Sequence, residues 1–508
     1  MKILFIYPDV ITPMINFCPA VHSLSAYLKH RGYQTELIHV NNDNGVPMEP
    51  DVISSLAVKS KPNLIAVTST SFNYRHANEI AKWLRNALPS TPIIPGGSHA
   101  TVEPEDLTDS AFDAFCVGEG EEPLLEIVES IKLGRDWSKT KNMVVKLPDG
   151  TVQRNSTRGY LRNLDDLPFL DFDITDTPKI LKARQGWFSI SFSRGCPYEC
   201  SFCINHIYKE LTIGPGDKMS DYIRKRSPEN TVAELESIVR KYPGQIKVFN
   251  FDDDLLPMDK SWMQEYAALY TERILKPYKI KYAMNCRATF LDRDLAKLLA
   301  DSGCLEARIG FETGNEQLRK VILAKNVSDA ALIKAFAACD EFGVHTNAFA
   351  MMGLPGENPA TFADTVRMIA LLQPYLIRMT FLHPYTHTRI YDYCVEHNLF
   401  KPGDMREDSF TESPLRFPEL TDAQMFCYRF LFPWYVNLTL LGSDSSKTHE
   451  YRNLIARFEN RTFEELQESV QEIIELDSDI SKSIDVPHYR YFGGNGYYFQ
   501  LAGKYHNT

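Results

Sequence analysis

The chain has 508 residues, of which 44% are hydrophobic and 24% charged, and its net charge is −11. This length suits about three domains, and the composition is that of a globular protein, not of a disordered or fibrous one. The negative charge argues against a general nucleic-acid-binding protein, because such proteins use basic patches to displace counterions. Ten cysteines without a recognisable signal peptide favour a reducing compartment, so we expect a cytoplasmic protein without a transmembrane segment.

Residues 1–135 alternate short apolar runs with amphipathic stretches. This pattern predicts an α/β domain with a doubly wound parallel (Rossmann-like) sheet and helices on both faces. The expected strands are residues 3–7, 35–40, 64–69, 93–95 and 114–117, and the expected helices are residues 20–31, 74–87 and 122–131. Ligands bind such sheets beyond the carboxyl ends of the strands.

The loops after the third, fourth and fifth strands are rich in glycine and hydroxyl groups. Glycine lets a ligand approach the backbone closely, and hydroxyls supply hydrogen bonds. The candidate ligand-binding residues are Ser69, Thr70, Ser71, Gly96, Gly97, His99, Gly118, Glu119, Gly120 and Glu121. For His99, a hydrogen bond within its own loop is favoured over ligation of a metal.

Residues 136–182 are polar and turn-rich, and we expect them to form a linker. Within it, residues 146–152 predict a β-hairpin around Asp149 and Gly150.

Cys196, Cys200 and Cys203 follow the next predicted strand with the spacing C-x3-C-x2-C. Three thiolates on one tight loop can hold three irons of a 4Fe–4S cluster and leave the fourth iron open. An open position on a metal is where a substrate or cofactor can bind. The alternatives are three buried apolar cysteines, or a structural zinc site completed by His206. The sequence shows no second pair of ligands at zinc-site spacing, which favours the cluster.

From residue 183 to residue 395, six strand–helix units predict a partial (β/α)6 barrel, with its chemistry at the carboxyl ends of the strands. The expected strands are residues 188–193, 247–251, 281–285, 307–310, 345–351 and 376–381. Polar and glycine-rich positions follow them, and the candidate site residues are Asp253, Asp254, Arg287, Glu312, Gly353 and Pro355. Carboxylates there can accept hydrogen bonds from an ammonium group, and arginine can bind a carboxylate with two hydrogen bonds.

Residues 396–508 carry no motif that indicates a chemistry, and we expect a mainly helical domain that covers the substrate or has an accessory role. Its most unusual stretch is the aromatic segment 426–441, which is too short and too interrupted to span a membrane. A helix that packs in the core is favoured, and the alternative is an apolar substrate pocket or a membrane-surface contact. The tyrosine-rich tail, residues 489–505, could form a β-hairpin or cover the active site.

The cysteine loop, with Phe202 before its last cysteine, resembles the cluster loop of the radical S-adenosylmethionine (SAM) enzymes. Residues 96–104 and 117–121 resemble the cobalamin-binding domain that precedes many of these enzymes, and this resemblance covers residues 1–135. It implies that the strand-end loops cradle the corrin ring and the nucleotide tail of cobalamin. The Asp-x-His-x-x-Gly motif of many cobalamin proteins is missing, so no histidine from that motif would bind the cobalt.

The barrel positions resemble the same family. The resemblance implies that Phe202, Asp253, Asp254, Arg287 and Glu312 contribute to the SAM site. It also implies that Gly353 and Pro355, in the stretch Gly-Leu-Pro-Gly-Glu, lie near the adenine.

The resemblance as a whole implies a methyltransferase that moves a methyl group from SAM, via methylcobalamin, to an unactivated carbon. Its cofactors would be a 4Fe–4S cluster, SAM and cobalamin. Its partners would be a small-molecule or peptide substrate and an electron donor of the flavodoxin or ferredoxin type. One alternative is a radical cyclase or rearrangement enzyme on the same scaffold, without methyl transfer. Another is a cobalamin- or redox-sensing regulator, although a sensor need not keep Asp253, Arg287 and Glu312.

Overall fold

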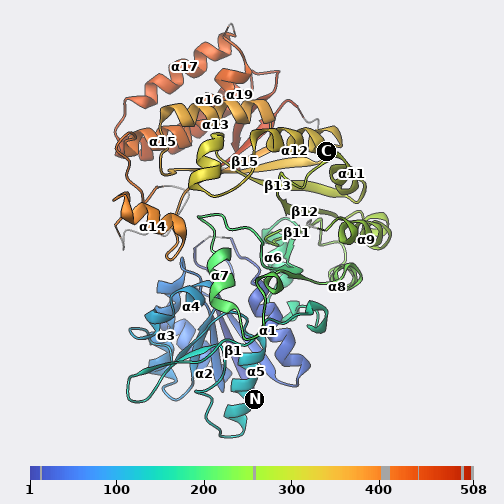
Figure 1. Cartoon of the computed structure of the whole chain (residues 1–508), viewed down its shortest axis with the longest axis vertical. Helices are drawn as coiled ribbons and strands as arrows, with labels where there is room; N and C mark the ends of the chain where they lie inside the picture. The colour runs from blue at the N-terminus through green and yellow to red at the C-terminus, as the bar shows by residue number, and fades with distance from the viewer. Residues whose placement is uncertain (12–13, 256–258, 402–411, 444, 494–496, 505–508) are drawn as a thin grey trace. The chain divides into compact units, whose positions relative to one another are not determined.

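The computed structural model describes residues 1–11, 14–255, 259–401, 412–443, 445–493 and 497–504 (Figure 1). The chain forms two compact units. The first consists of Met1–Pro197, Ile204–Asp254 and Glu272–Ile280, and the second of Tyr198–Cys203, Leu255–Thr271 and Lys281–Thr508.

The first unit is built on a four-stranded parallel sheet with the order β2-β1-β3-β4. Its strands are β1 (Lys2–Pro8), β2 (Gln34–Val40), β3 (Leu64–Thr68) and β4 (Ile93–Gly96). The helices that belong to it are α1 (Pro19–His30), α2 (Pro50–Ser60), α3 (Tyr74–Ala87), α4 (Ser98–Val102) and α5 (Glu121–Lys132). The predicted strands and helices are thus present, while α2 and the short α4 were not predicted.

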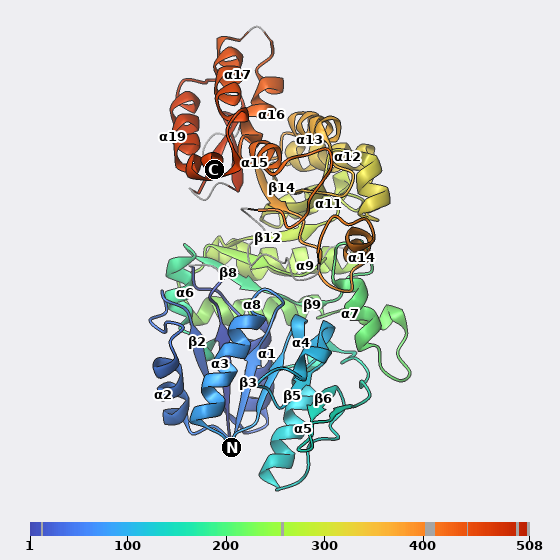
Figure 2. The ribbon, with the colours of Figure 1, turned by 90° about the vertical axis from the view of Figure 1, so that its left-hand side faces the viewer.

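Helices cover both faces of this sheet, as expected (Figure 2). Successive side chains of a strand point to opposite faces, so Leu4 and Ile6 of β1 join the core with α2 and α3. Ile3 and Phe5 join the core with α1 and α5. The doubly wound arrangement is therefore confirmed.

The fifth predicted strand has other partners than the parallel sheet. β5 (Ala114–Cys116) pairs antiparallel with β6 (Met143–Lys146), which in turn pairs antiparallel with β7 (Val152–Arg154). The predicted hairpin around Gly150 is present between β6 and β7. Because β6 takes the ladder hydrogen bonds of the three-residue β5, the strand belongs to a separate three-stranded sheet.

The first unit also holds the beginning of the predicted barrel. β8 (Trp187–Ile190) pairs parallel with β11 (Val248–Phe251), and β9 (Ser193–Arg194) pairs antiparallel with β10 (Arg224–Lys225). The accompanying helices are α6 (Thr177–Ala183), α7 (Asn205–Thr212), α8 (Pro228–Lys241) and α10 (Lys276–Tyr278).

The second unit holds four further parallel strands, β12 (Lys281–Cys286), β13 (Cys304–Glu312), β14 (His345–Met352) and β15 (Leu376–Phe381). The helices around them are α9 (Lys260–Tyr270), α11 (Arg293–Asp301), α12 (Asp329–Glu341), α13 (Pro359–Leu372) and α14 (Arg389–Glu396). All six predicted barrel strands are therefore present. The tail forms the antiparallel pair β16 (His488–Phe492) and β17 (Tyr498–Ala502), and β17 pairs antiparallel with β15. The tail is thus a hairpin that extends the sheet.

The remainder of the second unit is helical, as expected. Its helices are α15 (Asp422–Phe430), α16 (Phe432–Leu440), α17 (Ser446–Glu459), α18 (Phe463–Glu468) and α19 (Val470–Ser481). The aromatic segment supplies their common core, in which Phe426, Phe430 and Trp434 are buried. Pro433 lies in the first turn of α16, where its missing N–H costs no hydrogen bond. The favoured core-packing interpretation therefore accounts for these aromatic side chains.

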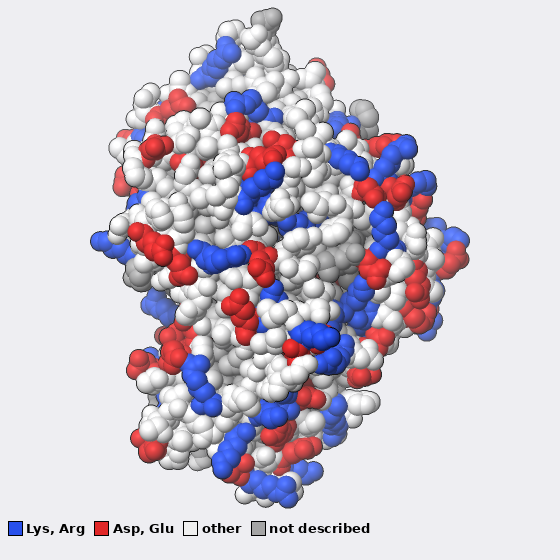
Figure 3. Space-filling model, viewed as in Figure 1, with Lys and Arg blue, Asp and Glu red and all other residues white. Residues whose placement is uncertain are grey.

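Two surface properties complete the fold. Among the described residues, no helix combines the length and the apolar character needed to cross a bilayer. On the face drawn in Figure 3, acidic and basic side chains are interspersed and form no continuous basic patch.

Candidate functional site

A cavity of about 420 Å³ opens at the carboxyl ends of β3 and β4 in the first unit. Its apolar lining includes Phe5, Ala66, Ile94, Leu124, Ile127 and Met143, which belong to the core between the sheet and helices α1 and α5. The volume lies within the range of small-molecule sites, roughly 300–1,000 Å³. This is the edge of the sheet where the sequence predicts a ligand.

Glycines form much of the cavity's edge: Gly96, Gly97, Gly118 and Gly120 line it. Gly97 has a φ of +107°, and a Cβ there would lie 2.5 Å from the carbonyl oxygen of Ser69. No other residue fits that position without moving the β3 loop. The loop after β4 can therefore turn tightly against the loop after β3 and leave the space in front of it open.

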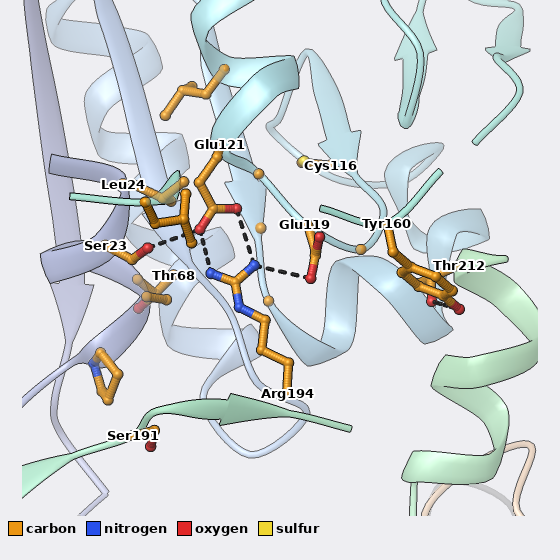
Figure 4. A pocket seen from close by; sticks show the side chains of 18 of the residues that line it. Ser23, Leu24, Thr68, Cys116, Glu119, Glu121, Tyr160, Ser191, Arg194 and Thr212 are labelled. Atoms are coloured by element: carbon orange, nitrogen blue, oxygen red, sulfur yellow. Dashed lines mark hydrogen bonds and ion pairs between the residues drawn. The ribbon is translucent and has the colours of Figure 1, made fainter. Parts of the chain in front are cut away.

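Four charged side chains meet at the cavity, and we call them the acid–arginine cluster: Glu119, Glu121, Arg194 and Arg224. Figure 4 shows the first three. The Arg194 guanidinium lies 2.6 Å from a carboxylate oxygen of Glu121 and 2.9 Å from one of Glu119. Arg224 binds the same Glu119 oxygen at 2.7 Å, and the Ser23 hydroxyl donates to Glu121 at 2.8 Å. Burial alone would raise the pKa of Glu121, but the charge of Arg194 and the hydrogen bonds from Arg194 and Ser23 together lower that pKa.

The predicted cobalamin contacts fall into two groups. Gly96, Gly97 and the loop Gly118–Glu121 line the cavity, whereas Ser69, Thr70, Ser71 and His99 are not among its lining residues. Thr70 donates its backbone N–H and its hydroxyl to Asn73, and the backbone of Ser69 bonds Gly96. His99 is buried, stacks on Tyr74 at 3.6 Å between ring centroids and places Nε2 3.0 Å from Asp106.

Asp253 lies in the first unit and fixes the segment that leads into the cysteines. Its carboxylate accepts hydrogen bonds from the backbone of Phe192 (2.9 Å) and from the backbone and hydroxyl of Ser193 (2.5 and 2.6 Å). Burial raises its pKa to about 6 despite these bonds. Asp254 is exposed next to Asn205. In this structure Asp253 therefore positions the backbone of Phe192 and Ser193, four and three residues before Cys196.

In the second unit, the part of the cysteine loop from Tyr198 to Cys203 is held by backbone contacts. The Ser201 hydroxyl donates to the carbonyl of Ile322 at 2.6 Å, and the Ser201 N–H donates to Leu323 at 2.9 Å. Phe202 packs against an apolar cluster that includes Leu323 and Leu354. Cys200 is buried and Cys203 is half-buried. The loop thus has a fixed backbone with its last cysteine partly accessible.

Arg287, which follows β12, lies beside this loop. Its Nη1 is 4.0 Å from the sulfur of Cys200, its guanidinium carbon is 3.6 Å from the ring centroid of Tyr198, and its Nη2 donates to the carbonyl of Asn326. The guanidinium thus contacts both the ring of Tyr198 and the sulfur of Cys200. Arg287 therefore supports the predicted cluster loop directly.

We expect Arg287→Ala to lower SAM cleavage roughly 10- to 100-fold, because hydrogen bonds to charged groups contribute about 1.5–3 kcal/mol. The measurement is the rate of 5′-deoxyadenosine formation with anaerobic, reconstituted protein. Arg293→Ala is the matched control, because Arg293 forms an exposed ion pair with Glu341 in the same unit. Equal rates for Arg287→Ala and the control would contradict a role for Arg287 at the cluster.

Glu312 ends β13 in an unusual backbone conformation. Its φ is +65°, a left-handed value that is uncommon for a residue other than glycine and often marks a functional site. Its buried carboxylate binds the ammonium group of Lys325 at 2.5 Å. The ammonium packs so closely over Gly310 that a Cβ there would collide with it. This buried ion pair occupies the strand end where a SAM contact is predicted.

The Gly353–Glu357 turn follows β14 and is held by its own glutamate. The Glu357 carboxylate accepts the N–H of Gly353 at 2.6 Å and the N–H of Leu354 at 3.3 Å. Gly353 has a φ of +72°, which suits glycine. Glu357 therefore shapes the turn in which Gly353 and Pro355 are predicted to approach the adenine.

The Glu357 carboxylate predicts a pH dependence of stability. Burial raises its pKa from 4.5 to about 7. Between these values the folded state binds more protons than the unfolded state, so the free energy of unfolding falls as pH rises. We expect Glu357→Gln to remove this loss, on the order of 1–3 kcal/mol between pH 5 and pH 8. The test is to measure the unfolding midpoints of the wild-type protein and of Glu357→Gln at pH 5 and pH 8. An equal change of the midpoint with pH in the two proteins would contradict this prediction.

The three cysteines supply the donor atoms that an iron–sulfur cluster uses. In a 4Fe–4S cluster each thiolate binds a different iron, so three thiols on one loop suit the cluster.

Arg194 and Arg224 are site residues that the sequence did not single out. Arg194 lies in the stretch Ser-Arg-Gly-Cys, two positions before the first cysteine, and that position is the only signal the sequence offers. Arg224 becomes its neighbour only through the pairing of β9 with β10.

Two family models match the chain. The radical SAM superfamily model matches residues 190–369, and the B12-binding domain model matches residues 19–128. The second match contains most of the cavity's sheet edge, and the first contains the three cysteines.

Two relatives found by sequence and one solved structure are similar to this chain over most of its length. An uncharacterized methyltransferase of Pyrococcus horikoshii is 23% identical over 375 residues, 73% of this chain and 78% of the relative. An anaerobic magnesium-protoporphyrin IX monomethyl ester cyclase of Rubrivivax gelatinosus is 24% identical over 480 residues, 90% of this chain and 81% of the relative. The solved radical SAM methyltransferase TsrM of Kitasatospora setae, with cobalamin and a 4Fe–4S cluster bound, superposes with a TM-score of 0.63 at 19% identity, covering 79% of each chain.

The chain therefore combines a B12-binding domain with a radical SAM domain. It is a radical SAM enzyme, homologous to cobalamin-dependent radical SAM methyltransferases, and the domains imply a 4Fe–4S cluster, SAM and cobalamin as cofactors.

The residues of the cavity fit cobalamin. Cobalamin carries a flat aromatic base on a polar nucleotide tail, and the cavity offers an apolar floor with a glycine-edged, charged opening. A Cβ at Gly96 would meet only the Cβ of Cys116, at 3.8 Å, so the space in front of this glycine is open. Burial raises the pKa of the Cys116 thiol to about 12, so the free thiol is neutral and adds no charge to the cavity.

Proposed function

We propose that the protein is a cobalamin-dependent radical SAM methyltransferase that methylates an unactivated carbon of a small molecule or peptide. The observation that carries the proposal is the presence, in one chain, of the glycine-edged cavity of the B12-binding domain and the three-cysteine loop of the radical SAM domain. When bound, the cluster and SAM supply a 5′-deoxyadenosyl radical, and cobalamin supplies a methyl carrier.

The residues of the chain then bind and orient the cluster, SAM and cobalamin. Cys196, Cys200 and Cys203 hold three irons, and Arg287 stabilises the charge of the Cys200 thiolate. Glu312 and the Gly353–Glu357 turn form the SAM site, with Glu312 held in place by Lys325. Gly96, Gly97 and the loop Gly118–Glu121 hold cobalamin. The cluster needs an electron from a low-potential donor of the flavodoxin or ferredoxin type, and its chemistry suits the reducing cytoplasm.

A radical cyclisation without methyl transfer is the second candidate. It is favoured by one observation: the magnesium-protoporphyrin ester cyclase covers 90% of this chain, more than the uncharacterized methyltransferase does. Both candidates share the cluster, SAM and the cavity.

Product mass separates the two candidates. The reconstituted protein is supplied with SAM that carries a trideuterated methyl group, a reductant and a metabolite extract from the source organism. A methyltransferase gives a product that contains the label and is heavier by one CD3-for-H exchange. A cyclase gives a product of changed mass without the label, and that result would replace the first proposal by the second.

A further inference from the structure

The acid–arginine cluster connects the two parts of the first unit that are predicted to hold different cofactors. Glu119 and Glu121 come from the loop that opens α5, in the B12-binding domain. Arg194 and Arg224 come from β9 and β10, in the radical SAM domain. Figure 4 shows the Arg194 guanidinium between the two carboxylates at the cavity.

The members of this cluster are largely removed from water. The side chains of Glu121 and Arg224 are only 4% and 6% exposed, and those of Glu119 and Arg194 are 21% and 28% exposed. Removing one partner of a buried ion pair leaves the other charge uncompensated, which is strongly unfavourable. A change in the position of the Glu119–Glu121 loop must therefore be followed by Arg194.

Arg194 has little freedom to move independently of the first cysteine. Gly195 has a φ of +87° and lies so close to Tyr222 that no side chain would fit, and Ser193 is fixed by Asp253 at 2.5 and 2.6 Å. Cys196 follows Gly195 directly. The segment from Ser193 to Cys196 is thus short, with Ser193 hydrogen-bonded to Asp253 and Gly195 lying against Tyr222.

We propose that Arg194 is a positioning residue that couples occupancy of the cavity to the order of the loop carrying Cys196. The inference rests on the proposed cofactors. A ligand in the cavity fixes the Glu119–Glu121 loop, this loop fixes Arg194, and Arg194 fixes the backbone ahead of Cys196. Coupling between two binding sites is reciprocal, so cobalamin slows loss of the cluster and the cluster tightens cobalamin.

The test measures cluster retention, which needs neither substrate nor turnover. Anaerobic protein that holds the cluster is mixed with an iron chelator, with and without hydroxocobalamin. The decay of the iron–sulfur absorbance is followed after the absorbance of cobalamin has been subtracted. We expect cobalamin to slow the decay of the wild-type cluster by about 5-fold or more, within the usual range of coupling between sites. In Arg194→Gln the two decay rates should agree within about 2-fold.

Three variants guard against a merely structural effect. Arg154→Gln removes an exposed ion pair with Glu105 in the same unit and should keep the wild-type ratio. Arg194→Lys keeps the charge and should restore part of the wild-type ratio between the decay rates without and with cobalamin. If Arg194→Gln does not fold, Glu119→Gln, which leaves the bond from Arg194 to Glu121, should still reduce it.

The proposal is overturned if cobalamin does not change the decay of the wild-type cluster, or if Arg194→Gln keeps the full ratio. Its failure is distinguishable from failure of the proposed function: a protein that binds both cofactors without coupling refutes only the role of Arg194. A protein that shows coupling but transfers no labelled methyl group refutes only the methyltransferase.

Discussion

Cys200→Ala should reduce 5′-deoxyadenosine formation to the background of SAM without protein. The cluster is expected to have three protein ligands, with its fourth iron left for SAM. Cys200 is the buried member of the three and lies 4.0 Å from Arg287. Its loss leaves two thiolates, which no longer hold three irons, and it leaves the Arg287 guanidinium without its anionic neighbour. Iron and sulfide content and the product are measured on the same anaerobic sample.

A cysteine elsewhere in the same unit gives the control for Cys200→Ala. Cys339 is fully buried in α12, and burial raises its pKa to about 12, so it stays a neutral thiol. Cys339→Ala should cost some stability through a small cavity but keep the cluster and the activity. If Cys200→Ala retained a full cluster and normal cleavage of SAM, the assignment of the loop would be wrong.

Gly96→Leu should weaken cobalamin binding roughly 10- to 100-fold, because it places a side chain in the space that the ligand would occupy. A Cβ at Gly96 meets only Cys116, at 3.8 Å, and the φ of Gly96 is not left-handed. The substitution is therefore compatible with the fold, and its effect falls on the cavity. Cobalamin retained after gel filtration is quantified by absorbance and by cobalt content.

Ala87→Leu is the matched control for the cavity, because it adds bulk at the end of α3, outside the lining residues. Iron–sulfur content, measured on protein reconstituted without cobalamin, should be unchanged in both variants. Normal cobalamin affinity in Gly96→Leu would mean that cobalamin binds elsewhere on the chain.

The alternation of apolar runs predicted the strands of both domains well, because buried parallel strands read as short apolar segments bounded by turn residues. It could not predict the partner of the fifth strand. Residues 114–116 have the same apolar pattern whether the strand joins a parallel sheet or an antiparallel one. Its partner is β6, which lies almost thirty residues later in the sequence. Similarly, Pro50 at the start of α2 is a helix-start signal that the alternation of apolar runs does not reveal.

Site residues that are close together in the sequence could be predicted from it. Site residues that only the folded chain brings together could not. The spacing of Cys196, Cys200 and Cys203 is a local pattern, and the loop 118–121 lies at a strand end. The acid–arginine cluster pairs acids and arginines that are 73 positions or more apart, and only the pairing of β9 with β10 brings Arg224 to Glu119. Ser69 and His99 carry groups suited to ligand binding, but neither lines the cavity: the Ser69 backbone N–H donates to Gly96, and His99 Nε2 lies 3.0 Å from Asp106.

The most direct test of the account is the pair of products formed from SAM by anaerobic protein reconstituted with iron, sulfide and cobalamin. The account predicts 5′-deoxyadenosine together with S-adenosylhomocysteine, with omission of cobalamin removing the second product and Cys200→Ala removing the first. The account would be contradicted if a protein with an intact cluster and bound cobalamin, supplied with a competent reductant, formed neither product.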